Sequence, residues 1–212
     1  MIRIMLVEDH TVVRNGYRRL FDAEEDMKVV AEAASADEAY ACLSAGDVDL
    51  AVVDLNLRGS SGLDAIRRML ARERGLKILV ISMHDNPSYV TQAIRLGALG
   101  YVTKCSEPDE MLEAIRQVTE GRRFLSADIA QVLASAALEG DALLARLTPK
   151  EFDVLCMVVT GESTTSVAET LHLSPKTIYN HMTAIRQKLE VDNDFKLIQL
   201  AARFGLVTLS PR

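Results

Sequence analysis

Residues 50–54 read Leu-Ala-Val-Val-Asp, a short apolar run that ends on a carboxylate. Four similar runs lie in the first half of the chain, and a helix-like stretch follows each of them. The expected strands are Ile2–Val7, Lys28–Ala33, Leu50–Asp54, Leu76–Ser82 and Leu99–Thr103, and the expected helices are Thr11–Phe21, Ser35–Leu43, Gly62–Ala71, Pro87–Leu96 and Pro108–Thr119. Strands that alternate with helices are typical of a parallel sheet covered on both faces. We therefore predict an α/β unit with a five-stranded, doubly wound parallel sheet.

The composition agrees with a globular protein of one ordinary domain and a smaller second one. The chain has 212 residues, of which 49% are hydrophobic and 25% are charged. Its apolar runs are much shorter than the roughly 18 residues that a membrane span needs, and no secretion signal is recognisable. The three cysteines, Cys42, Cys105 and Cys156, are far apart and form no CxxC pair, which argues against a disulfide framework or a zinc site. We expect a soluble, cytoplasmic protein with no membrane partner.

Polar side chains follow or end four of the five expected strands. Glu8 and Asp9 follow the first, Asp54 ends the third, Ser82 ends the fourth, and Lys104 follows the fifth. Ligands of parallel α/β sheets gather at this edge. Three carboxylates in one place repel one another unless a hard divalent cation such as Mg²⁺ neutralises them. An acidic pair alone would indicate only the first turn of a helix, but its convergence with the other groups favours a magnesium site.

The second half of the chain changes character after Glu139-Gly140-Asp141, which we expect to be a linker. A helix before it is expected at Ala127–Leu138, and helices after it at Pro149–Val159, Thr164–Leu171, Pro175–Leu189 and Asp194–Phe204. Thr148 and Glu151 have the spacing of a capping box at the start of the first helix after the linker. The short turn at 172–174 gives the next two helices helix-turn-helix spacing. We therefore predict a small all-α unit.

The helix expected at Pro175–Leu189 has an apolar and a polar face. The apolar face, within an arc of about 60°, is formed by Ile178, Met182, Ile185 and Leu189. The polar face carries Lys176, Tyr179, Asn180, Thr183 and Gln187. These polar groups suit hydrogen bonds to bases or phosphates, although any amphipathic helix has a polar exterior. Net charge does not by itself indicate nucleic-acid binding, because residues 147–212 hold seven basic and seven acidic residues.

Residues 1–122 resemble the receiver domain of bacterial two-component response regulators, which has a flavodoxin-like fold. The matching positions are Glu8, Asp9, Asp54, Ser82 and Lys104. The resemblance implies that Asp54 accepts a phosphoryl group, that Ser82 binds a phosphoryl oxygen and that Lys104 pairs with the phosphate. It also implies that Tyr101 is a switch residue, which rotates into the space left when Ser82 moves inward. The implied Mg²⁺ ligands are Glu8, Asp9, Asp54 and the main-chain carbonyl of Asn56.

Residues 143–208 resemble the LuxR-type DNA-binding domain of the NarL/FixJ response regulators. The matching residues include Leu147-Thr148-Pro149-Lys150-Glu151, Gly161, Val167-Ala168, Lys176-Thr177-Ile178 and Lys188-Leu189. The resemblance implies that Tyr179, Asn180 and Thr183 enter the major groove, and that Lys176, Thr177 and Lys188 lie near phosphates. Asn180 is suited to a two-point contact with adenine. The chain departs from the family at Thr165, where a lysine is common.

The resemblances together imply a phosphorylation-controlled transcription regulator with a receiver domain at 1–122, a helical linker at 123–142 and a DNA-binding domain at 143–208. The expected partners are a sensor histidine kinase, promoter DNA, RNA polymerase and, after phosphorylation, a second copy of the chain. We do not expect an enzyme, apart from self-catalysed phosphorylation and dephosphorylation. A nucleotide-binding enzyme is disfavoured, because neither GxGxxG after the first strand nor GxxxxGK[ST] is present. A protein-interaction relay without DNA binding and a DNA-binding protein independent of phosphate remain as alternatives.

Overall fold

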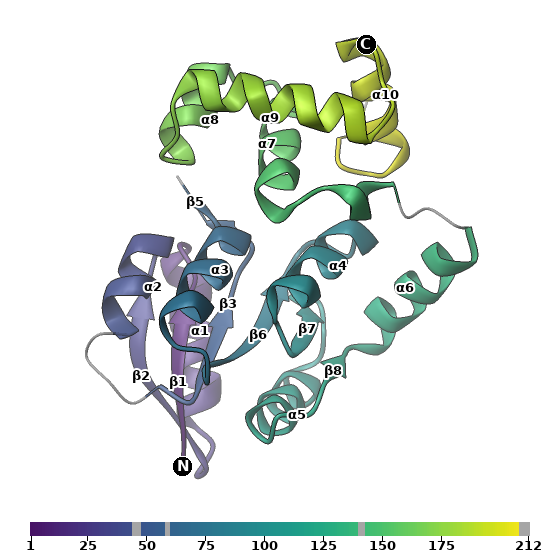
Figure 1. Ribbon diagram of the computed structural model, residues 1–212. Coiled ribbons are helices and arrows are strands. Elements are labelled where there is room, and N and C mark those ends of the chain that lie inside the picture. The colour runs from purple at the N-terminus through teal and green to yellow at the C-terminus, as the bar shows by residue number, and fades with distance from the viewer. Residues whose placement is uncertain (44–47, 58–59, 140–142, 208–212) are drawn as a thin grey trace. The chain divides into compact units, whose positions relative to one another are not determined.

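The computed structural model describes residues 1–43, 48–57, 60–139 and 143–207 (Figure 1). The chain divides into two compact units, Met1–Ala134 and Ser135–Arg212. Each unit has its own fold, so the two are described separately. No helix of the described residues has the length and apolar character that crossing a membrane requires.

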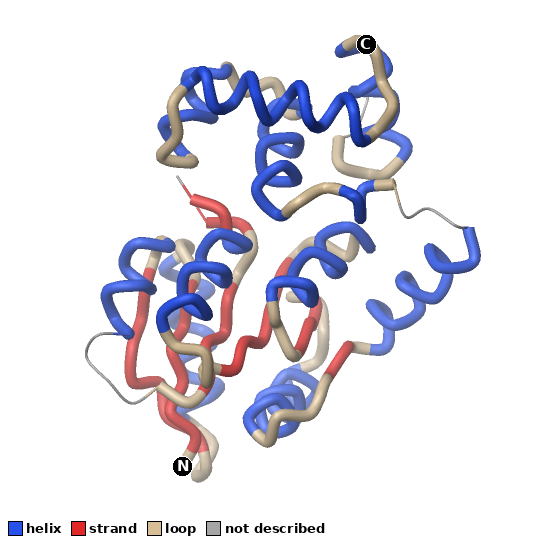
Figure 2. The backbone as a smooth tube through the Cα atoms, viewed as in Figure 1, coloured by secondary structure: helices blue, strands red, loops and turns tan. Residues whose placement is uncertain are grey.

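The first unit is built on a six-stranded parallel sheet with the order β2-β1-β3-β6-β7-β8. Its strands are β1 (Ile2–Val7), β2 (Met27–Ala33), β3 (Leu50–Val53), β6 (Lys77–Ser82), β7 (Gly100–Thr103) and β8 (Phe124–Leu125). Its helices are α1 (Thr11–Asp22), α2 (Ala36–Cys42), α3 (Gly62–Arg72), α4 (Pro87–Leu96) and α5 (Pro108–Thr119). Figure 2 shows the strands as a central layer between helices. Residues of α1 and α5 share one apolar core with the sheet, whereas α2, α3 and α4 lie side by side.

The predicted doubly wound α/β class is confirmed, and the expected elements lie within one residue of their predicted ends. The prediction of five strands was wrong, because β8 adds a sixth. β8 pairs in parallel with β7 and places Leu125 opposite Tyr101. A two-residue strand is too short for an alternating pattern to be recognised in the sequence. A second unpredicted feature is the small antiparallel hairpin of β4 (Asn56–Leu57) and β5 (Ser60–Ser61).

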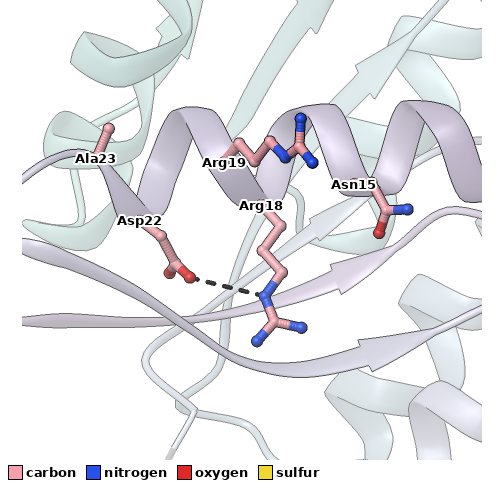
Figure 3. Close-up of a pocket in the computed structure, with 5 residues that line it drawn as sticks. All are labelled: Asn15, Arg18, Arg19, Asp22 and Ala23. Atoms are coloured by element: carbon pink, nitrogen blue, oxygen red, sulfur yellow. Dashed lines mark ion pairs between the residues drawn. The ribbon is translucent and has the colours of Figure 1, made fainter.

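The outer face of α1 carries an open hollow of about 500 Å³ (Figure 3). It is lined by Asn15, Arg18, Arg19, Asp22 and Ala23. Arg18 lies toward Asp22, with 3.6 Å between Nε and Oδ2, and its Nη1 donates to Glu32 of β2 at 2.6 Å. The pair with Glu32 attaches α1 to β2, the edge strand of the sheet. None of the lining residues is a predicted site residue.

The second unit consists of short helices around a small core. Its helices are the 3-10 helix η2 (Leu144–Arg146), α7 (Pro149–Val159), α8 (Thr164–Thr170), α9 (Pro175–Lys188) and α10 (Asp194–Arg203), while α6 (Ala127–Glu139) spans the division between the units. The capping box of Thr148 and Glu151 is present. The predicted apolar face of α9 is buried: Ile178, Met182, Ile185 and Leu189. Gly140 and Asp141, which the sequence indicates as linker, lie outside the described residues.

Candidate functional site

Two of the three predicted acidic groups, Glu8 and Asp54, meet at the carboxyl ends of adjacent strands. Glu8 follows β1 and Asp54 follows β3, and the main-chain N–H of Asp54 donates to Val7 at 2.9 Å. Lys104, which follows β7, donates from Nζ to Asp54 Oδ2 at 2.8 Å and to Glu8 Oε2 at 2.6 Å. The exposed fractions are 2% for Glu8 and 3% for Asp54. One ammonium group is therefore shared by two buried carboxylates.

The charge balance of this cluster is incomplete without a further cation. Burial raises the pKa of Asp54, although the hydrogen bond from Lys104 acts in the opposite direction. Burial alone would lower the pKa of Lys104, but its hydrogen bonds to Asp54 and Glu8 raise it. The second carboxylate oxygen of Asp54, Oδ1, is buried and accepts no hydrogen bond from the described residues. An unpartnered buried oxygen on a carboxylate that shares Lys104 with Glu8 fits a hard cation with oxygen ligands.

A glycine brings the start of α3 against the main chain of Asp54. A Cβ atom on Gly62 would lie 2.2 Å from the carbonyl oxygen of Asp54 and 2.4 Å from the Cα of Leu55. Real Cβ atoms do not approach main-chain atoms so closely. Gly62 therefore allows the close packing that positions Asp54, and its main-chain N–H donates to the Leu55 carbonyl at 3.0 Å.

The two predicted switch residues lie on neighbouring strands behind the acidic cluster. Ser82 ends β6 with no exposed surface, and its carbonyl accepts from the main-chain N–H of Lys104 at 2.9 Å. Tyr101 of β7 is also fully buried, and its hydroxyl donates to the carbonyl of His84 at 2.6 Å. Burial raises the pKa of this hydroxyl above its ordinary range. Tyr101 therefore already occupies a buried position beside the loop that follows Ser82.

Two histidines border the cluster and were not predicted as site residues. His10 Nδ1 lies 2.9 Å from Asp9 Oδ1 and 3.1 Å from Glu8 Oε1. His84 Nε2 lies 2.7 Å from the side-chain oxygen of Asn56, which opens the β4–β5 hairpin. Burial lowers the pKa of His84. His10 directly follows the acidic pair and was recognisable from the sequence, whereas no pattern links His84 to Asn56.

The helix-turn-helix geometry of the second unit follows from its caps. Ser163 caps α8 by accepting from the main-chain N–H of Ser166, and Ser174 caps α9 by accepting from that of Thr177. Between the helices, His172 has a positive φ of 52°, which closes the turn. The exposed residues of α9 that the sequence indicates for base contacts are Tyr179, Asn180 and Thr183. The exposed fraction of Tyr179 is 63%, which is unusual for an aromatic side chain of a small domain.

The residues indicated for phosphate contacts differ in their environments. Lys176 is exposed in the first turn of α9, and Thr177 lies beside the Ser174 cap. Lys188 instead donates from Nζ to both oxygens of Glu151, at 2.8 and 2.6 Å. Glu151 is the capping-box residue of α7, and Lys188 attaches α9 to that helix. The ammonium of Lys188 is therefore already bound to a carboxylate within the unit.

The fold and the site together define a class of protein. Its first unit is a flavodoxin-like α/β fold in which a lysine contacts two carboxylates at one edge of the sheet, and its second unit is a helix-turn-helix fold. Family models agree with both parts. Residues 4–116 match the response regulator receiver domain, and residues 145–201 match the bacterial regulatory proteins of the luxR family.

Relatives and solved structures cover nearly the whole chain. The chain is 33% identical over 209 residues to the response regulator UvrY of Escherichia coli, with 97% of this chain and 96% of that protein covered. A LuxR-family two-component response regulator from Aurantimonas sp. is 43% identical, covers 64% of this chain and 97% of its own, and has a TM-score of 0.62. RcsB from Salmonella enterica serovar Typhimurium, bound to the promoter P1flhDC with the phosphomimetic BeF3⁻, is 25% identical, with 95% and 98% coverage and a TM-score of 0.74. The chain belongs to the NarL/FixJ family of bacterial response regulators.

Proposed function

We propose that Asp54 is the phosphoryl acceptor that controls DNA binding by this transcription regulator. The observation that carries the proposal is the lysine bridge: Lys104 lies 2.8 Å from Asp54 and 2.6 Å from Glu8, while the other oxygen of Asp54 has no hydrogen bond from the described residues. A structural ion pair would satisfy both oxygens. A buried carboxylate with one open oxygen is instead suited to attack on phosphorus.

The residues of the cluster have separate roles in the transfer. The groups that would hold Mg²⁺ are Glu8, Asp9, Asp54 and the main-chain carbonyl of Asn56. Bound Mg²⁺ would supply positive charge to the phosphoryl oxygens, where negative charge is spread in the transition state. The Asp54 carboxylate forms the new bond to phosphorus as the bond to the donor breaks. Lys104 neutralises the phosphoryl group, and the Ser82 hydroxyl donates to one of its oxygens.

The signal then leaves the site through β6 and β7. Ser82 and Lys104 are joined by a main-chain hydrogen bond, and Tyr101 holds the carbonyl of His84, two residues after Ser82. A hydroxyl drawn toward a phosphoryl group would pull on this loop. Tyr101 would then change its contact with His84 and alter the surface of β7 and α4, which is a two-state response of the kind that phosphorylation produces.

We propose that α9 reads DNA in the major groove. The base contacts come from Tyr179, Asn180 and Thr183, and phosphate contacts come from Lys176, Thr177 and the main-chain N–H groups at the start of α9. RcsB, to which this chain is similar over 95% of its length, has been solved bound to a promoter, which supports a DNA-binding role for the second unit. Because Lys188 is bound to Glu151, we assign it a secondary place among the phosphate contacts.

The domains and partners follow from these roles. We propose a receiver domain at 1–122, a helical linker at 123–142 and a DNA-binding domain at 143–208. A sensor histidine kinase supplies the phosphoryl group, and the phosphorylated chain dimerises on promoter DNA in the cytoplasm. Dimerisation doubles the small protein–DNA surface of one domain, which is about 600–1,000 Å² for single modules. RNA polymerase is the partner at the promoter. The chain acts as a switch, with self-catalysed phosphorylation and dephosphorylation as its only chemistry.

Phosphate incorporation tests the acceptor. Incubation with acetyl phosphate and Mg²⁺ should add one phosphate to the wild-type chain, as measured by intact mass. Asp54→Asn should take up none, and Asp85→Asn, a change in the exposed loop after Ser82, should take up one. Equal incorporation in the wild type and Asp54→Asn would refute the assignment. Incorporation that is unchanged when Mg²⁺ is removed with a chelator would refute the metal requirement.

A further inference from the structure

A cavity of about 300 Å³ lies between α4, α6 and the outer strands of the sheet in the first unit. It is lined by Val90, Thr91, Ile94, Arg95, Leu99, Arg123, Leu125 and Leu133. Figure 1 shows α6 beside α4 and β8. Leu99 directly precedes β7, so the cavity lies toward the amino end of that strand, whereas the acidic cluster lies at the carboxyl ends. The cavity is therefore separate from the phosphorylation site.

The lining combines an apolar wall with positive charge. Five of its eight residues are aliphatic, two are arginines, and none is acidic. Its volume is at the lower end of the range for ligand pockets, which is about 300–1,000 Å³. An aliphatic wall favours an alkyl chain, and a guanidinium group pairs with a carboxylate through two parallel hydrogen bonds. A cation or a strongly polar molecule would lose hydration without a compensating contact.

We propose that this cavity binds an alkyl carboxylate of medium chain length. The chain packs against Ile94 and Leu125 and against Leu133 of α6, and the carboxylate pairs with Arg123. The site does not depend on the acidic cluster. It requires only the apolar wall and the Arg123 guanidinium group.

The position of the cavity connects such a ligand to the switch strand. The main-chain N–H of Ser126, just before α6, donates to the carbonyl of Tyr101 at 3.1 Å. Thr103 of β7 donates from its hydroxyl to Asp128 of α6 at 2.9 Å. The first turn of α6 is therefore attached to the strand that carries Tyr101 and leads to Lys104. A ligand held between α4 and α6 would restrain the helix through which the chain continues to its second unit.

Calorimetric titration of the full chain with decanoate, below its micelle concentration, tests the proposal. We expect saturable binding of one decanoate per chain. Decyltrimethylammonium, which has the same chain and the opposite charge, and acetate, which has the charge without the chain, should not bind. Binding of all three probes, or of none, would overturn the proposal.

Neighbouring arginines provide a matched pair of variants. Arg123→Gln should weaken decanoate binding about tenfold, the loss expected for one charged hydrogen bond. Arg122→Gln removes the adjacent arginine, which pairs with Glu120 and does not line the cavity, and should leave the affinity unchanged. Leu133→Gln should weaken binding by a similar factor through the apolar wall. Equal affinities of Arg123→Gln and Arg122→Gln for decanoate would overturn the proposal. A dimer in sedimentation that dissociates when decanoate is added would also overturn it, because a second copy of the chain would then be the occupant of the cavity. Asp54→Asn should bind decanoate normally, so this test is independent of the proposed phosphorylation.

Discussion

Replacing Lys104 with methionine removes the ammonium group that bridges Asp54 and Glu8, with little change in side-chain volume. The two carboxylates are 3% and 2% exposed, so water cannot replace the lost partner. Breaking a buried ion pair from one side costs about 3–5 kcal/mol. We expect the lower end, about 3 kcal/mol, because a buried carboxyl group whose pKa is already raised can take up a proton. At about 4 °C per kcal/mol for a unit of this size, the melting temperature should fall by about 12 °C.

Mg²⁺ should reverse most of this loss, because it supplies positive charge to the same oxygens. Thermal unfolding of the full chain, followed by circular dichroism, should therefore show a gain from Mg²⁺ that is much larger in Lys104→Met than in the wild type. Lys28→Met is the control, since it breaks an ion pair with Asp22 in which the lysine is 48% exposed, and such pairs contribute about 1 kcal/mol or less. A melting temperature of Lys104→Met within 2 °C of the wild type without Mg²⁺, or equal gains from Mg²⁺ in both, would refute the reasoning.

Three further predictions concern the helical unit. Lys176→Ala should weaken binding to all DNA sequences alike and reduce the salt slope by about one unit, whereas Lys188→Ala should leave that slope nearly unchanged; equal changes in slope would contradict the assignment. Asn180→Ala should reduce the DNA-binding free energy by about 1–3 kcal/mol on a duplex selected from a random pool, and by much less on unselected duplexes. Equal losses on both kinds of duplex would show that α9 is misassigned as the helix that contacts the bases. Burial raises the pKa of Glu151, but the hydrogen bonds from Lys188 and Thr148 together outweigh it and hold the pKa below its ordinary value of 4.5. The resulting stabilisation is present above that value and is lost as the pH falls through the lowered pKa. The free energy of unfolding, measured in urea, should therefore decrease less on acidification in Glu151→Gln than in the wild type. Identical pH profiles of the two proteins would contradict this role of Glu151.

The parts of the fold that were predictable are those with a local physical cause. The short apolar runs, the capping box of Thr148 and Glu151, and the apolar arc of α9 all lie within a few residues of sequence, and each is present in the structure. The convergence of Glu8, Asp54 and Lys104 was also predictable, because the carboxyl ends of parallel strands share one edge.

The features that were missed depend on contacts between distant segments. β8 has only two residues and is formed by pairing with β7. The bond between Lys188 and Glu151 joins positions 37 residues apart, so the sequence pattern gave no sign that this lysine is engaged within its own unit. The same holds for the contact between His84, in the loop after β6, and Asn56 of the two-residue strand β4, which are 28 positions apart.

Phosphorylation-dependent DNA affinity tests the central claim most directly. Duplexes selected from a random pool by the full chain would be titrated by fluorescence anisotropy with wild-type and Asp54→Asn protein, each with and without acetyl phosphate and Mg²⁺. We expect acetyl phosphate to raise the affinity of the wild type at least tenfold and to leave that of Asp54→Asn unchanged. An equal response in both proteins, or tight binding by both without any phosphodonor, would contradict control of DNA binding through Asp54.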